Sequence, residues 1–143
     1  MAGFQFSESL SGTYQRDGQE RKISFQVTAR ADSIWKFLHD RRAQLDGVID
    51  VAGLAENAPL EGSIVIDPFV GRIIRYEFGF PGADGKPYRF LGEKHIDPLH
   101  PVETSTTLPG TVSNAAGTFS APALLHFHTQ DLIPFLASFR PVL

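Results

Sequence analysis

Near its N-terminus the chain alternates between apolar and polar residues in two stretches, residues 4–14 and 23–29, with a turn sequence between them. A period of two is that of a β-strand with one buried face and one wet face. The pair Asp17-Gly18 can adopt the positive φ angles of a tight hairpin turn. The sequence therefore predicts two antiparallel strands that pair with each other.

The same alternation returns further along the chain. Turn-rich segments such as residues 81–85 (Pro-Gly-Ala-Asp-Gly) separate the later stretches. The predicted later strands cover residues 48–53, 62–66, 72–80, 88–97, 102–112 and 119–128.

Two segments change to the spacing of a helix. Asp32 is the predicted N-cap of a helix over residues 33–45. Thr129 or Asp131 is the predicted cap of a second helix near residues 130–140. A length of 143 residues suits a single domain, here 1–143. We expect a β-rich α+β fold of about eight mostly antiparallel strands, arranged as a sandwich or a partly closed barrel, with two amphipathic helices over edges or an open end.

Residues 4–45 and 102–140 share an order of elements, a hairpin followed by a capped helix. Short matches such as Leu10-Ser11-Gly12-Thr13 against Leu108-Pro109-Gly110-Thr111 accompany it. An internal duplication would make the two units superpose. Alternatively, any hairpin that leads into an amphipathic helix would give this pattern.

Charge and composition exclude several classes of protein. The 13 basic and 16 acidic residues give a net charge of −3, without the basic surface that a nucleic-acid backbone requires. There is no cysteine to act as a nucleophile. No apolar run approaches the ~20 residues of a membrane span, and the first ten residues lack the features of a signal peptide. We expect a cytoplasmic protein.

Two charged residues fall where the alternation places apolar ones. Lys94 is in register with Phe90, Gly92 and Ile96, and Glu8 lies in the apolar register of the first strand. A buried charge is costly unless it is paired, so we expect Lys94 and Glu8 to face each other or a ligand. The alternative is a bulge that lets Lys94 reach water.

Aromatic residues are abundant, with 12 phenylalanines in the chain. Phe78, Phe80, Tyr88 and Phe90 share the inward register of two predicted strands. They either fill the core or line a pocket for an apolar ligand.

Imidazole and carboxylate side chains occur at alternate positions of two predicted strands. His126 and His128 leave the same face of one strand and could share a metal ion. Glu93, His95 and Asp97 share a face of another predicted strand. A further strand could lie between these three residues and the two histidines. The alternative interpretation is the solvated face of a sheet.

Several short tracts together resemble one known family. They are residues 6–12 (Phe-Ser-Glu-Ser-Leu-Ser-Gly), Tyr76-Glu77-Phe78 with Gly85 and Tyr88, Gly92-Glu93-Lys94, residues 104–108 and residues 135–140. They resemble the β-rich accessory domain found with cholesterol-oxidase-like flavoproteins of the glucose–methanol–choline oxidoreductase class. The resemblance implies an accessory module, with an oxidoreductase as partner and no chemistry of its own. Residues 79–85 lack the spacing of a dinucleotide-binding loop, so no flavin or oxidase activity is expected of this chain.

Taken together, these patterns predict a binding or accessory module without catalytic activity or cofactor. Its ligand would be an apolar small molecule or a partner protein, held by Lys94, Glu8 and the four aromatic residues. The alternative function is a small metal-dependent enzyme that uses His126 and His128.

Overall fold

The computed structural model describes residues 3–67, 70–97, 99–100, 104, 106–127 and 140–142. Antiparallel strands dominate this part of the chain. In order, the elements are β1 (Gly3–Arg16), β2 (Gln19–Ala31), α1 (Ile34–Asp40), β3 (Arg42–Val51), β4 (Ala55–Asp67), β5 (Ile73–Pro81), β6 (Pro87–His95), β7 (Thr107–Asn114), β8 (Ser120–His126) and β9 (Arg140–Val142).

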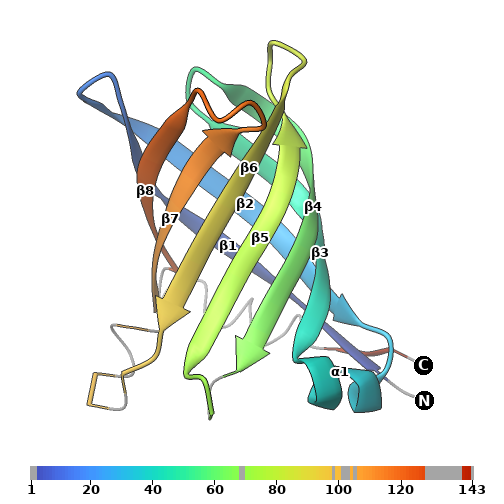
Figure 1. The fold of residues 1–143 in the computed structure, drawn as a ribbon. Helices are drawn as coiled ribbons and strands as arrows, with labels where there is room; N and C mark the ends of the chain where they lie inside the picture. Colours follow the sequence, from blue (N-terminus) through green and yellow to red (C-terminus); the bar gives the residue numbers. More distant parts are fainter. Residues whose placement is uncertain are drawn as a thin grey trace.

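Strands β1 to β8 form a closed antiparallel barrel (Figure 1). Each strand pairs with the next one in the sequence, and β8 pairs with β1 to close the sheet. Consecutive connections therefore alternate between the two ends of the barrel. Because β8 pairs with β1 through residues 11–14, the sheet does not end in two free edge strands, which reduces the hazard of edge-to-edge aggregation.

Strand β1 makes the closure possible because it is long enough for three partners. It pairs with β2 along residues 4–16, with β8 through residues 11–14 and with β9 through residues 3–5. Gly12 lies where β1 meets β8, and a Cβ at this position would come within 1.9 Å of the Leu124 carbonyl oxygen. Only glycine permits this approach of the two backbones.

The alternation seen in the sequence decides which side chains enter the barrel. On β2, Ile23, Phe25 and Val27 are buried, while Lys22 and Gln26 are exposed. The hairpin at Asp17-Gly18 is confirmed, with positive φ at both residues.

Aromatic rings fill the middle of the barrel. Phe25 from β2 reaches Phe78 of β5 and Phe90 of β6, with ring centroids 5.2 and 5.5 Å away. The neighbouring glycines Gly92 and Gly110 leave room for the Phe90 ring, since a Cβ on either would come within 2.8 Å of a ring carbon. These two glycines are therefore part of the core packing.

Two expectations about the fold class are wrong. The described chain is all-β with a short helix, rather than α+β, and its barrel is closed rather than partly closed or a sandwich; the expected eight antiparallel strands are confirmed. Helix α1 has seven residues and no buried ones, and residues 42–45, which were expected in the helix, belong to β3. Strand pairing of β3 with β2 and β4 outweighs the helical spacing.

The helix cap also differs from the expectation. Ser33 is the N-cap, and its hydroxyl oxygen accepts a hydrogen bond from the Lys36 backbone N–H. Asp32 instead forms an ion pair with Arg30 at 2.8 Å. The predicted second helix lies outside the described residues, apart from Arg140, which belongs to β9.

The proposed duplication is described only in part. The β1–β2 and β7–β8 hairpins are both present, but the helix of the second unit falls outside the described residues.

None of the described helices is both long and apolar enough to cross a membrane.

Replacing Gly92 by alanine tests the packing of Phe90. The new methyl group would meet the Phe90 ring at 2.8 Å and Leu108 at 3.0 Å. We expect Gly92→Ala to lower the free energy of unfolding by about 1–3 kcal/mol in urea denaturation. Gly79→Ala is the control, because its methyl group meets nothing closer than 3.5 Å. Equal stabilities of the two variants would contradict this packing.

Candidate functional site

Three polar side chains point into the barrel from different strands. Glu8 lies on β1, Tyr76 on β5 and Lys94 on β6. Their positions follow from the pairing registers, because Glu8 is opposite the buried Val27 and Lys94 is opposite the inward-facing Ile74. Alternation thus places all three on the inner face.

Tyr76 connects two opposite walls of the barrel. Strands β1 and β5 are four strands apart around the eight-stranded ring. The Tyr76 hydroxyl nevertheless donates a hydrogen bond to Oε1 of Glu8, 68 residues away in the sequence. The Tyr76 side chain is only 1% exposed, so it spans the interior rather than the rim.

Lys94 lies beside this hydrogen bond without an ion pair. It is 4% exposed, and its Nζ lies 5.3 Å from the centroid of the Tyr76 ring. Among the residues that the structure describes, no carboxylate lies within salt-bridge distance of Nζ. The expected direct pair with Glu8 is therefore not formed, because Glu8 is held by Tyr76 instead. Nor does a bulge carry Lys94 to water.

The electrostatics of Tyr76 and Lys94 reflects their burial. Desolvation lowers the pKa of the Lys94 ammonium below its ordinary value, and the Glu8 carboxylate offsets only part of this effect. Burial, followed by the charge of Glu8 and the hydrogen bond to it, raises the pKa of Tyr76 well above its ordinary value. Tyr76 therefore remains a hydrogen-bond donor at neutral pH, while Lys94 is a buried cation that lacks a close counter-ion.

The four aromatic residues expected at the site are stacked against one another. Phe78 lies 5.2 Å from Phe90 and 6.5 Å from Phe80, and Phe80 lies 5.9 Å from Tyr88, measured between ring centroids. Tyr88 in turn contacts Phe119, with 6.2 Å between ring centroids, and its hydroxyl donates to Asp84 in the β5–β6 turn at 2.8 Å. In this half of the barrel the rings fill the interior.

Only one histidine of the predicted pair belongs to the described chain. His126 is exposed on the outer wall, and His128 lies outside the described residues. Strand β7 lies between β6 and β8 and so separates His126 from Glu93 and His95. Within the described ranges, no group of three or more His, Cys, Asp or Glu side chains could hold a metal ion.

Glu93 and His95 form contacts typical of a solvated wall. Glu93 pairs with Arg75 at 2.5 Å and lies 3.1 Å from His95. The hydrogen bond from Arg75 lowers the pKa of Glu93.

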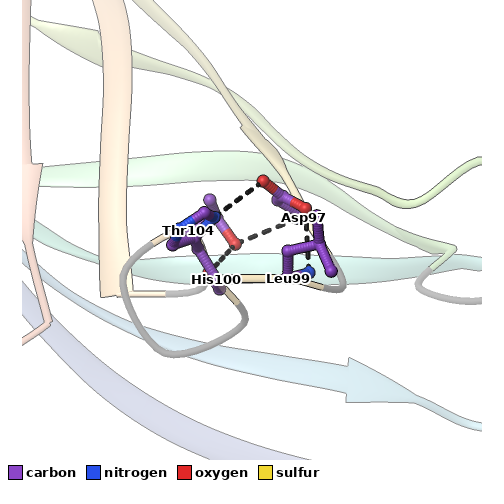
Figure 2. A network of polar contacts seen from close by, with 4 residues as sticks. All are labelled: Asp97, Leu99, His100 and Thr104. Atoms are coloured by element: carbon purple, nitrogen blue, oxygen red, sulfur yellow. Dashed lines mark hydrogen bonds and ion pairs between the residues drawn. The ribbon is translucent and has the colours of Figure 1, made fainter.

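Asp97 instead forms its hydrogen bonds with residues that follow β6 (Figure 2). Its carboxylate accepts the Leu99 backbone N–H at 2.9 Å and lies 3.1 Å from His100, while the Asp97 backbone N–H donates to the Thr104 hydroxyl. These bonds join Asp97 to the described residues Leu99, His100 and Thr104.

None of the three described hollows is lined by Glu8, Tyr76 or Lys94. The largest of the three, of about 860 Å³, is lined by residues of β2 to β6, among them Asp46 and Glu61 and two of the expected site residues, Phe80 and Tyr88. The other two lie over β4 to β7 and over β1 to β3. Lys94, a buried cation without an ion pair among the described residues, is therefore a feature of the interior and not of these hollows.

Sequence reasoning found Lys94 and Glu8 but missed their connection. Tyr76 looked like one more aromatic residue in the inward register of its strand. A buried tyrosine usually requires a partner for its hydroxyl, and this requirement was the signal that could have linked it to Glu8.

Searches against protein-family models, curated proteins and solved structures found no match to this chain. The fold therefore defines it only as an eight-stranded antiparallel barrel with a polar group inside. Its resemblance to the accessory domain of cholesterol-oxidase-like flavoproteins, and the partner oxidoreductase implied by it, remain predictions.

A double-mutant cycle tests which partner holds Glu8. We expect Tyr76→Phe and Glu8→Gln to be coupled by about 1–2 kcal/mol in urea denaturation, because they share a hydrogen bond to a charged group. The cycle of Lys94→Met with Glu8→Gln should give a smaller coupling, since those groups are not in contact. The reverse order would show that Glu8 pairs with Lys94 instead.

The pKa of Lys94 predicts a pH dependence of stability. In the unfolded chain the ammonium titrates near its ordinary 10.5, and in the folded chain it titrates lower. Between the two values the unfolded chain binds more protons, so the free energy of unfolding rises with pH as the pH approaches 10.5. Lys94→Met removes this rise. We therefore expect the natural chain to gain stability relative to Lys94→Met over this range.

Urea denaturation at a series of pH values measures the difference. Lys22→Met, at an exposed position of β2, is the control and should keep a constant difference from the natural chain. A Lys94→Met difference that is equally flat would show that Lys94 titrates normally in the folded protein.

Proposed function

We propose that this protein is a non-catalytic binding module that takes a small molecule with an apolar body and an anionic or hydroxylated head into its barrel. The observation that carries the proposal is Lys94, which is 4% exposed and forms no ion pair with any residue that the structure describes. An isolated buried charge costs several kcal/mol, and a ligand anion next to Nζ would offset that cost.

The barrel supports this function by its size. Eight-stranded barrels have an interior that side chains can fill or that can hold one small ligand. Here the row from Phe78 to Tyr88 fills the half toward the β5–β6 turn. The ligand would lie on the other side of Phe78 and Phe90, where Glu8, Tyr76 and Lys94 meet.

The three polar groups would have different roles in binding the ligand. Lys94 would bind the charged or hydroxylated head of the ligand. The Tyr76 hydroxyl donates its hydrogen bond to the Glu8 carboxylate. Because of this bond, Glu8 would not form an ion pair with Lys94, and it would not face the ligand without a partner. The inward apolar side chains beside them would contact the body of the ligand.

Calorimetric titration with octanoate and octanol tests the proposal, since the two probes share a chain length and differ in charge. We expect octanoate to bind about tenfold or more tightly than octanol, because of its charge-assisted contact with Lys94. Lys94→Met should abolish this preference, whereas the control Lys22→Met should retain it. Equal binding of the two probes by the natural chain, or a preference that survives in Lys94→Met, would refute Lys94 as the anchor.

A further inference from the structure

Lys94 differs from the other lysines of the chain. The sequence contains four lysines, of which Lys22, Lys36 and Lys86 are exposed, whereas Lys94 is 4% exposed on the inner face of β6. It is also the only charged side chain that is buried among the described residues. Water solvates the charge of an exposed ammonium, and a buried amine loses that solvation. The barrel therefore holds one amine in surroundings that the other three do not share.

The surroundings of Lys94 favour an uncharged amine. Lys94 lies opposite Ile74, and its Nζ lies 5.3 Å from the centroid of the Tyr76 ring. No carboxylate of the described chain lies within salt-bridge distance of Nζ. Burial lowers the pKa of Lys94 below its ordinary value, and the charge of Glu8 offsets part of this effect. Since only the unprotonated form of a lysine is a nucleophile, burial makes this amine more reactive than an ordinary one at the same pH.

Glu8 is placed to stabilise a cation at this position without forming an ion pair with the amine. Its Oε1 accepts the hydrogen bond of the Tyr76 hydroxyl, and its charge nevertheless raises the pKa of Lys94. A protonated imine carries the same single positive charge as an ammonium. The interior therefore combines a nucleophilic nitrogen with a nearby anion that suits a cationic product of its reaction.

We propose that Lys94 forms an imine with an aldehyde whose apolar body lies inside the barrel. The inference rests on the interior ligand site proposed above and adds a covalent step to it. The geometry that carries it is a primary amine inside a barrel lined mostly by apolar side chains, without an ion pair to any described residue. The ligand class is that of apolar aldehydes, with the carbonyl carbon next to Nζ.

The step is a condensation that needs no oxidant or reductant. The lone pair of Nζ forms a bond to the carbonyl carbon, and the oxygen takes the π electrons of the C=O bond and a proton. The nitrogen then forms the C=N bond as the oxygen leaves as water. One amine and one aldehyde thus give one imine and one water, whose two hydrogens are balanced by the two that the amine nitrogen loses. Exclusion of bulk water from the interior protects the imine from hydrolysis.

Reductive alkylation with octanal and cyanoborohydride tests the inference, because reduction converts the imine to a stable secondary amine that peptide mass spectrometry locates. With less than one equivalent of octanal, we expect the folded chain to carry the octyl group on Lys94 about tenfold or more often than on Lys22, Lys36 or Lys86. In urea this preference should disappear, since unfolding gives the four lysines similar surroundings. A folded chain in which Lys94 is labelled no more than the exposed lysines would overturn the inference.

Glycolaldehyde, which is small and polar, is the matched control for the apolar body of the ligand. It should label the three exposed lysines at least as well as Lys94, because it gains nothing from an apolar interior. The same preference for Lys94 with both aldehydes would show that the reactivity of the amine alone is responsible, and would refute apolar aldehydes as the ligand class.

Octanoate separates failure of this inference from failure of the proposed function. It should slow the labelling of Lys94 by octanal and leave the labelling of Lys22, Lys36 and Lys86 unchanged, because both eight-carbon molecules occupy the interior. Octanoate binding that depends on Lys94, together with no selective labelling by octanal, would overturn the imine and leave the proposed function standing. Selective labelling by octanal without any binding of octanoate would keep the imine and refute the anionic ligand.

Discussion

The hydrogen bond from Tyr76 to Glu8 is the contact on which the character of the interior depends. It connects opposite walls of the barrel through Glu8, which is half-buried, and Tyr76, which is buried. A buried hydroxyl is tolerated when it is hydrogen-bonded, and this bond provides the partner of the Tyr76 hydroxyl. It also decides the state of Lys94, because a carboxylate engaged by Tyr76 does not approach the ammonium to salt-bridge distance.

The interior consequently has two unlike parts. Toward the β5–β6 turn, stacked rings from β2, β5 and β6 fill the barrel, with two glycines making room for Phe90. Beyond Phe78 and Phe90, the three polar side chains share the enclosure. The packed part supplies the stability of a small core, since its area is apolar and close-packed. The polar part lowers that stability and is the part that a ligand would improve.

The outside of the barrel is divided in a similar way. The wall alternates charged and polar residues that pair with one another, as Arg75 does with Glu93. The end of the barrel that carries α1 displays exposed apolar side chains instead, among them Trp35 and Leu99. Lys94 lies near the end of β6 on this side, so the polar part of the interior is nearer to this end than the aromatic row is.

The alternation of apolar and polar residues predicted most of the strands and the faces of their side chains, because a period of two is a local property of each strand. It placed Lys94 and Glu8 in the inward register and the hairpin at Asp17-Gly18. It did not determine that the sheet closes, since closure depends on the long-range pairing of β1 with β8, nor that residues 42–45 join β3 rather than the helix. Only the tertiary structure decided the partner of Glu8. Strand order places β5 opposite β1, and which side chains meet across a barrel is set by the number and stagger of its strands, which no local pattern records.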